Sequence, residues 1–204
     1  KCSSLTSIVI SNSVVSIGDG AFKFSSLSNI VIPDSMTSIG SGAFWGCCSL
    51  SNVVVPDSVT SIGNGAFRSC SSLSNVIIPN SVTSIGNGTF YGCRSLSNIG
   101  IPSCVTNIAN FLFCGCRSLS DIVIPDSVTS IGIGAFSNCR FLSNIVIPDS
   151  VTNIRRGAFY KCNLPYNLKQ NFISRFSNEL FMFPLKIPGF KSLYNYSKKN
   201  YGDN

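Results

Sequence analysis

Two neighbouring stretches decide the fold: residues 119–141 (LSDIVIPDSVTSIGIGAFSNCRF) and residues 142–164 (LSNIVIPDSVTNIRRGAFYKCNL) are nearly the same sequence. The period of 23 residues (142 minus 119) extends through most of the 204-residue chain, with one residue missing between Phe22 and Leu27. Periods of about 20–50 residues are typical of solenoids. Three columns carry the period: Leu5, Leu27, Leu50, Leu73, Leu96, Leu119 and Leu142; Phe22, Phe44, Phe67, Phe90, Phe113, Phe136 and Phe159; and Pro33, Pro56, Pro79, Pro102, Pro125 and Pro148.

Each repeat begins with a pattern that predicts a short strand. In the first quoted repeat, Ile122 and Ile124 share one face, and Asp121 and Val123 share the other. Pro125 lacks an N–H group and therefore ends the strand. The following SVTSI predicts a second extended segment, and GAFSNC is too short for more than one helical turn or a 3₁₀ segment.

A single repeat cannot bury its own apolar side, but repeats stacked in register can. At about 4.8 Å per coil, equivalent side chains would form continuous internal ladders. The main stabilising term would be burial of a Phe, a Leu and several Ile or Val side chains in each coil. We therefore predict a right-handed, parallel β-solenoid of leucine-rich-repeat type over residues 1–162, with about seven coils.

The repeat ends after Cys162, and residues 163–204 are predicted to form a C-terminal cap and tail. Leu168, Phe172, Phe176 and Leu180 recur every four residues, which predicts an amphipathic helix over about 165–181. A solenoid end exposes unpaired strand edges, so we expect this helix to cover that end. A partner-binding or membrane-surface helix is the alternative, and the rest of the tail is expected to be irregular.

Composition argues against several classes of function. The net charge of +7 is spread thinly instead of clustered, so no nucleic-acid partner is expected. No apolar run approaches the roughly 20 residues that a membrane-spanning helix needs, so no membrane insertion is expected within this segment. The chain has no His, which removes the commonest general base and most transition-metal sites. We expect no enzymatic activity, no catalytic or metal-binding residues and no cofactor.

Aspartates and cysteines each form a column that needs an explanation. An aspartate directly follows the proline in four repeats and is explained by turn chemistry, with a Ca²⁺ ladder as the less favoured alternative. The cysteine column is expected to hold reduced, buried thiols, although disulfides between neighbouring coils would also be compatible with the spacing. Phe24 is expected to interrupt this column. The aspartates are Asp34, Asp57, Asp126 and Asp149, and the column cysteines are Cys2, Cys47, Cys70, Cys93, Cys116, Cys139 and Cys162.

Two surfaces are candidate binding sites. The outward strand face combines aliphatic and hydrogen-bonding side chains, which suits protein recognition, although β-branched residues are also simply good strand formers. An arginine follows the cysteine column in three successive coils and could form a basic stripe, or only a solvated edge. The strand face consists of Asn29, Val31, Asn52, Val54, Asn75, Ile77, Asn98, Asp121, Val123, Asn144 and Val146, and the stripe of Arg94, Arg117 and Arg140.

The repeat pattern LxxIxIPxSVTxIGxxAFxxCxS closely resembles the BspA-like, or Treponema-type, leucine-rich repeat over about residues 1–162. Departures from the pattern are local, as at Thr89, Ala109 and Leu112. The resemblance implies a surface or secreted protein, since members are typically surface proteins of bacteria and mucosal protozoa. It also implies adhesion, since several members bind host matrix proteins.

The leading hypothesis is a non-enzymatic protein-binding module that acts in cell-surface adhesion or recognition. Its repeated strand face would make many equivalent weak contacts with a protein partner, which could be a host or matrix protein. The alternative is a structural spacer or stalk within a larger surface protein. Lys1 already lies inside a repeat, so the chain is expected to be part of something longer, and a cytoplasmic location stays open.

Overall fold

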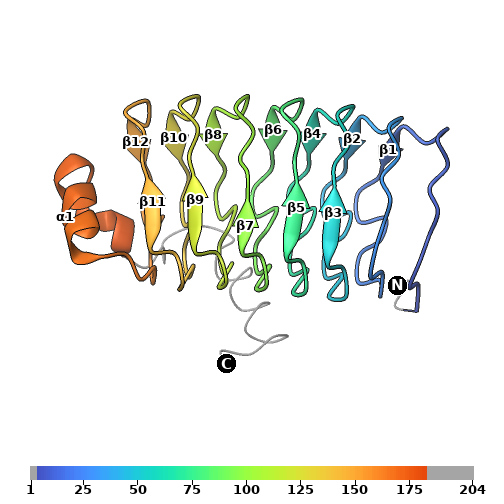
Figure 1. The fold of residues 1–204 in the computed structure, drawn as a ribbon, viewed down its shortest axis with the longest axis horizontal. Coiled ribbons are helices and arrows are strands. Elements are labelled where there is room, and N and C mark those ends of the chain that lie inside the picture. The colour runs from blue at the N-terminus through green and yellow to red at the C-terminus, as the bar shows by residue number, and fades with distance from the viewer. Residues whose placement is uncertain (1–3, 183–204) are drawn as a thin grey trace.

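Most repeats contribute two short parallel strands, one on each side of the turn that begins at the proline (Figure 1). The computed structural model describes residues 4–182. One row of strands contains β1 (Ser16–Ile17), β2 (Ser38–Ile39), β4 (Ser61–Ile62), β6 (Ser84–Ile85), β8 (Asn107–Ile108), β10 (Ser130–Ile131) and β12 (Asn153–Ile154). The other row contains β3 (Asn52–Val54), β5 (Asn75–Ile77), β7 (Asn98–Ile99), β9 (Asp121–Val123) and β11 (Asn144–Val146).

Most neighbouring strands of each row pair in parallel, with equivalent residues opposite one another, although β6 does not pair with β8, nor β7 with β9. Asn52 lies opposite Asn75, and Asn75 lies opposite Asn98. A one-residue slip would move every apolar side chain of a strand to the wrong face, so the repeat fixes the register. These pairings confirm the predicted parallel β-solenoid of leucine-rich-repeat type.

The irregular second repeat accommodates its missing residue in the turn after the cysteine column. Phe24 adopts a left-handed φ of 60°, as Gly46 does at the equivalent position of the next coil. Ser25 then occupies the cysteine column, with its Oγ 3.2 Å from Cys47 Sγ. The expectation that Phe24 interrupts this column was therefore wrong, because the residue is missing between Ser25 and Leu27.

The phenylalanine column forms the centre of the core. Adjacent rings stack with centroids 5.2 Å apart for Phe44 and Phe67, and 5.8 Å apart for Phe90 and Phe113. Stacked aromatic pairs contribute about 0.5–1.5 kcal/mol beyond the burial of their area. The column joins all coils into one continuous core whose fully buried rings are Phe44, Phe67, Phe90, Phe113, Phe136 and Phe159.

The cysteine column adds a second ladder beside the phenylalanines. Each buried thiol donates to a phenylalanine carbonyl of the preceding coil; the Sγ–O distance is 3.1 Å from Cys93 to Phe67 and from Cys116 to Phe90. The cysteines of residues 4–182 are free thiols, and those of the column are buried. Cys2 lies outside the described residues. Burial raises the pKa of Cys93 to about 12 and also raises that of Cys116 well above its ordinary value.

The C-terminal end of the solenoid is covered by a helix and a 3₁₀ turn (Figure 1). Phe172 of α1 (Tyr166–Arg175) extends the aromatic column, with its ring centroid 5.3 Å from that of Phe159. The 3₁₀ turn η1 (Asn178–Phe181) continues the backbone ladder, since Phe159 N–H donates to Leu180 O at 2.9 Å. The cap therefore accepts backbone hydrogen bonds from N–H groups of the last coil that would otherwise have no partner coil.

The capping segment differs from the single helix expected over about 165–181. The α-helix ends at Arg175, where the backbone leaves helical geometry at Phe176 (φ −125°, ψ −78°), and the Arg175 side chain turns back onto the last coil. Its guanidinium donates to Ile147 O at 3.0 Å and to Pro148 O at 2.9 Å. Ser177 is extended and begins the separate 3₁₀ turn by accepting a bond from the Glu179 N–H. The irregular tail expected beyond residue 182 lies outside the described residues.

Buried thiols should make the fold sensitive to alkaline pH. An unfolded cysteine ionises near its ordinary pKa of 9.0, whereas folded Cys93 stays protonated up to about pH 12. Each such thiol therefore makes a contribution to the free energy of unfolding that is fully present below pH 9. This contribution is lost as the pH rises toward 12, by up to about 1.4 kcal/mol per pH unit for each thiol. We predict that the free energy of unfolding of Cys93→Ala, measured by urea denaturation between about pH 8 and about pH 10.5, falls less steeply than that of the wild type. Identical slopes would contradict the assignment.

Candidate protein-binding face

The outward face of the β3–β11 row presents a line of aliphatic side chains. Each three-residue strand alternates, so that Val53 is buried while Asn52 and Val54 point outward. The parallel register then sets Val54 beside Ile77 in the next coil. We call this line the apolar stripe; each member is more than half exposed, and it consists of Val9, Val31, Val54, Ile77, Val123 and Val146. Val9 was not among the residues chosen from the sequence.

Gly100 interrupts the apolar stripe in the coil that contains β7. A Cβ atom built on Gly100 would meet no other atom within 4 Å, so the position is open to solvent. Its neighbours in the stripe are Ile77 on one side and Val123 on the other. The result is a gap in the stripe that is one side chain wide.

A polar row runs beside the apolar stripe. The serines of this row brace neighbouring coils, as when Ser74 Oγ donates to Ser51 O at 3.2 Å. In one coil an aspartate replaces the asparagine, and Asp121 accepts a bond from Ser120 Oγ at 2.9 Å. The exposed members predicted as candidate partner contacts are Asn29, Asn52, Asn75, Asn98, Asp121 and Asn144.

The three arginines of the predicted basic stripe lie on the turns that precede the strands. Arg140 is exposed, and its Nε donates to Asn138 Oδ1 at 2.9 Å. Arg94 and Arg117 are only partly exposed. Five residues lie between Arg117 and Val123, so the arginines precede the strand face and do not belong to it.

Aspartates border the apolar stripe more closely on its other side. Only two residues lie between Val54 and Asp57, and the Asp57 carboxylate is exposed. Two central coils carry Asn80 and Ser103 at this position in place of an acid. We call this row the acidic border, and it consists of Asp34, Asp57, Asp126 and Asp149.

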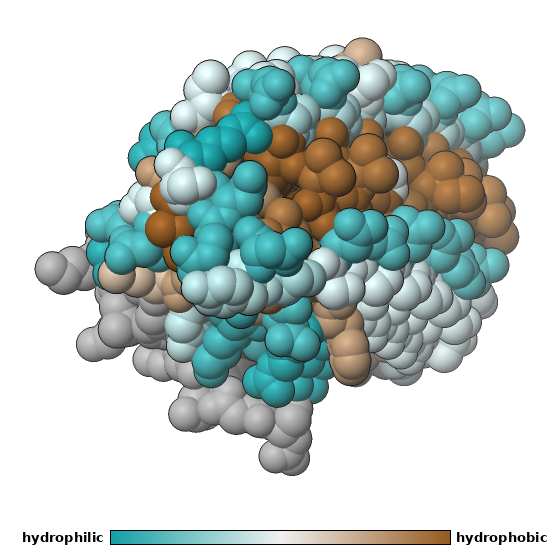
Figure 2. Space-filling view, turned by 60° about the vertical axis from the view of Figure 1, so that its left-hand side comes forward, coloured by the Kyte–Doolittle hydropathy of each residue, from teal (hydrophilic) through white to brown (hydrophobic). Residues whose placement is uncertain are grey.

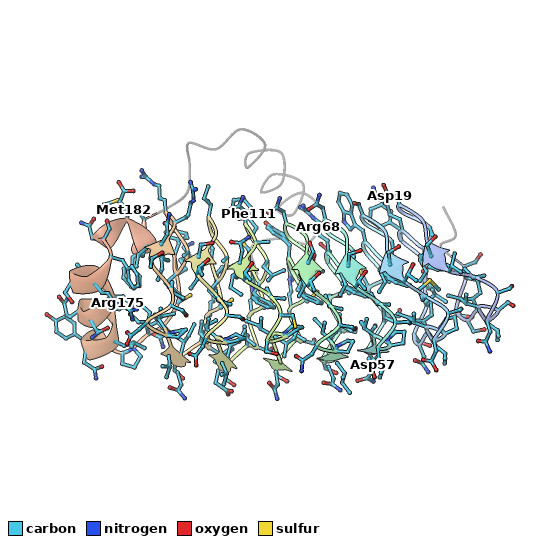
Figure 3. All side chains as sticks on the ribbon, turned by 90° about the horizontal axis from the view of Figure 1, so that it is seen from above. Asp19, Asp57, Arg68, Phe111, Arg175 and Met182 are labelled. Atoms are coloured by element: carbon cyan, nitrogen blue, oxygen red, sulfur yellow. The ribbon has the colours of Figure 1, made fainter. Side chains whose placement is uncertain are left out.

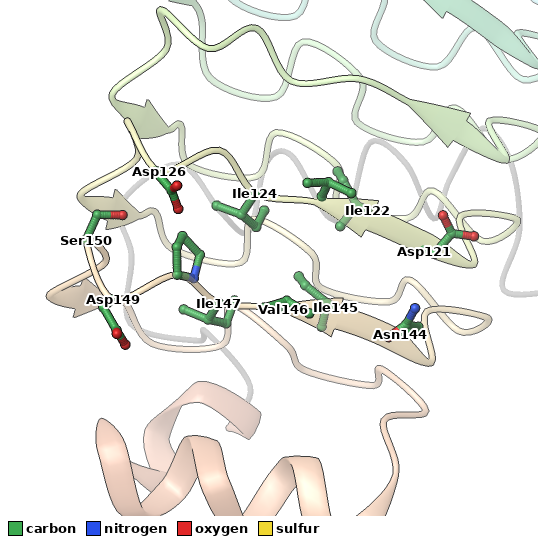
Figure 4. A pocket seen from close by; sticks show the side chains of 12 residues that line it. Asp121, Ile122, Ile124, Asp126, Asn144, Ile145, Val146, Ile147, Asp149 and Ser150 are labelled. Atoms are coloured by element: carbon green, nitrogen blue, oxygen red, sulfur yellow. The ribbon is translucent and has the colours of Figure 1, made fainter.

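The stripe and the acidic border meet in a recess between β9 and β11 with a volume of about 670 Å³. Figure 4 shows Asp126 and Asp149 at one end of the recess, with Ile124 and Ile147 beside them. Asp121 lies at the other end, and none of the Lys and Arg residues between residues 4 and 182 lines the recess. Figure 2 shows a hydrophobic band bounded on both sides by hydrophilic rows. The recess therefore offers apolar contact within an acidic surround.

The opposite side of the molecule carries a different ladder, in the column that follows the phenylalanines. Lys23 Nζ lies 3.9 Å from the Trp45 ring centroid. The Arg68 guanidinium lies 4.9 Å from the Trp45 ring and 4.4 Å from the Tyr91 ring, and Arg68 is only 5% exposed. In Figure 3, Arg68 and Phe111 lie on the side opposite Asp57.

A groove of about 550 Å³ runs along this cation–aromatic ladder. Its other wall is polar, and Asn64 Oδ1 in that wall accepts a bond from the Asn87 N–H at 2.7 Å. Sequence reasoning did not predict this ladder. Its signal in the sequence is the alternation of cationic and aromatic residues at one repeat position, namely Lys23, Trp45, Arg68 and Tyr91.

Within residues 4–182, no three His, Cys, Asp or Glu side chains converge as metal ligands would. The same residues include no helix with the length and apolarity needed to span a bilayer. The acidic border itself is a spaced row and not a cluster. The chemistry of the strand face is therefore that of apolar contact, amide hydrogen bonds and separated charges.

Short parallel strands, a repeat of 23 residues and internal Leu and Phe ladders define a leucine-rich-repeat β-solenoid. A sequence model of the BspA type leucine-rich repeat region matches residues 1–119 and 60–187 with six copies, against the about seven coils expected from the sequence. The chain belongs to this family. A comparison with curated proteins found no match.

Solved structures include similar proteins. The *T. pallidum* leucine-rich repeat protein is 31% identical, with a TM-score of 0.74 over 79% of this chain and 76% of that chain. A leucine-rich cell surface protein from *Faecalibacterium prausnitzii* is also 31% identical, with a TM-score of 0.61 over 86% of this chain and 57% of that chain. A leucine-rich repeat protein from *Bacteroides ovatus* is 26% identical, with a TM-score of 0.56 over 86% of this chain and 46% of that chain. The chain thus spans only about half the length of the latter two.

The cation–aromatic ladder should contribute measurably to stability. Arg68→Ala removes a buried cation between two rings and is expected to lower the free energy of unfolding by about 1–2 kcal/mol. The control is Arg140→Ala, which removes an exposed arginine and should change it by less than about 0.5 kcal/mol. Chemical denaturation measures both. Equal effects of the two substitutions would contradict a stabilising role for the ladder.

Proposed function

We propose that the chain is a non-enzymatic protein-binding module that recognises its partner through the apolar stripe and the polar row beside it. One observation carries the proposal: six aliphatic side chains, each more than half exposed, align along one face of a rigid solenoid. Soluble proteins seldom expose a long contiguous apolar surface without a partner for it. The adjoining asparagines supply hydrogen bonds, which protein interfaces combine with apolar contact.

The repeat architecture also supports a binding role. Solenoids present extended surfaces on which equivalent groups recur at each coil. Here an outward asparagine recurs from Asn52 to Asn75 to Asn98, and an aliphatic side chain accompanies the first two. Many weak contacts could then add up along one partner segment, in the manner of linked binding sites.

We further propose that the module works at a cell surface in adhesion or recognition. The support is family membership and the similarity to a *Faecalibacterium prausnitzii* protein that is described as a leucine-rich cell surface protein. A protein of the extracellular matrix is the partner class to test first. A spacer that holds other domains apart is the alternative, and it gives the strand face no role.

The double variant Val54→Asp/Val123→Asp tests the proposal against a panel of purified matrix proteins in biolayer interferometry. Both valines are exposed, so the melting temperature should stay within a few degrees of that of the wild type while binding falls at least about tenfold. The control is Ser84→Asp/Asn107→Asp, which adds the same charge to the outward positions of β6 and β8. Binding that survives in the valine variant, or a wild type that binds no matrix protein, would favour the spacer.

A further inference from the structure

The acids of this chain are distributed unevenly. The sequence has 15 Lys and Arg but only eight Asp and Glu. Five of those eight acids lie on the strand face or on its acidic border, namely Asp34, Asp57, Asp121, Asp126 and Asp149. The strand face of a basic chain is thus locally acidic.

The carboxylates of the acidic border are largely available to a partner. Within residues 4–182, no cationic side chain pairs with Asp34, Asp57 or Asp126. Asp149 approaches Arg175 at 3.4 Å, yet its side chain is fully exposed. The arginines of the basic stripe precede the strands in each coil, whereas the aspartates of the acidic border follow them. Exposed carboxylates beside an apolar surface favour a partner that carries both cationic and apolar side chains.

The acids fall into two groups with a neutral interval between them. Asp57 and Asp126 are three repeats apart (126 minus 57 is 69 residues), which corresponds to about 15 Å along the stack. In the interval, Ser103 donates its N–H and its hydroxyl to Asn80 Oδ1 at 3.0 and 3.2 Å, so these two side chains are bonded to each other. The gap at Gly100 lies in the same interval.

We propose that the strand face binds an extended polypeptide segment that runs along the solenoid axis and carries two cationic side chains four residues apart, with an apolar side chain midway. Four residues of extended chain span about 13 Å, and the side chains at the first, third and fifth positions face the same way. Flexible Lys or Arg side chains cover the remaining distance to Asp57 and Asp126. The coil of Gly100 lies two repeats after that of Asp57 and one repeat before that of Asp126, so the central apolar side chain enters the gap between Ile77 and Val123 when the segment is shifted slightly toward Asp126. This inference rests on the proposed function and specifies the chemistry of the partner.

Fluorescence anisotropy with labelled peptides tests the pattern directly, using the full chain at about 20 mM salt, where charge effects are least screened. The probe is the peptide GKTLTKG, and the comparison peptides are GETLTEG and GKTSTKG. We expect the lysine peptide to bind at least about tenfold more tightly than the glutamate peptide, and the serine peptide to bind more weakly than the leucine peptide. Raising the salt to about 300 mM should weaken the binding of GKTLTKG.

Variants of the protein locate the binding. Asp57→Asn/Asp126→Asn should weaken binding of GKTLTKG about three- to tenfold, because each exposed charge contributes a modest amount. Gly100→Val should weaken it similarly by filling the gap, and it should leave folding intact because a Cβ there meets no other atom within 4 Å. The control is Asp19→Asn, which removes one charge on the opposite side and keeps the Oδ1 that accepts from the Ser41 N–H.

Equal binding of the lysine and glutamate peptides would overturn the inference. So would the absence of lysine-peptide binding up to millimolar concentration, or an unchanged affinity in Asp57→Asn/Asp126→Asn. The proposed function fails separately, through the valine variant. If matrix binding needs Val54 and Val123 but peptide binding ignores the aspartates, the strand face is a binding site for a partner of different chemistry.

Discussion

In-register stacking of like residues is the constraint on which the rest of the structure depends. No single coil encloses a core, so Phe67 is buried only because Phe44 and Phe90 lie against its two faces. The same stacking aligns the thiols that donate to backbone carbonyls, and it aligns the strands whose outward residues form the apolar stripe. Interior and surface are therefore set by one periodicity.

Exact repetition from coil to coil shapes the core, whereas departures from the repeat shape the surface. Strict repetition builds the core, where each position tolerates only a narrow range of volumes. The surface is varied in a few coils: Gly100 opens the stripe, Asn80 and Ser103 interrupt the acidic border, and Arg68 lies between two aromatic rings on the opposite side. We infer that these departures distinguish this face from those of other repeat proteins with the same core.

The strand positions, the core columns and the repeat class could be predicted from sequence, because periodicity and burial are coupled directly in a solenoid. The structure near the missing residue and at the end of the capping helix could not be predicted from sequence. The place of the missing residue near Ser25 depended on Phe24 taking a left-handed backbone. The Arg175 side chain bonds to the carbonyls of Ile147 and Pro148, distant partners that no local pattern encodes. The outward residues were chosen correctly as exposed, but the pairing of Arg68 with Trp45 and Tyr91 required comparison across coils.

Deletion of one whole coil tests the stacking account most directly. Removing residues 119–141 joins Ser118 to Leu142, restores the period and brings Phe113 against Phe159. The account predicts a folded chain with a cooperative unfolding transition by circular dichroism, less stable than the wild type by the contribution of one coil. Removing only residues 119–129 destroys the register and should abolish that transition. If the half-coil deletion folds as well as the whole-coil deletion, the core does not depend on in-register stacking.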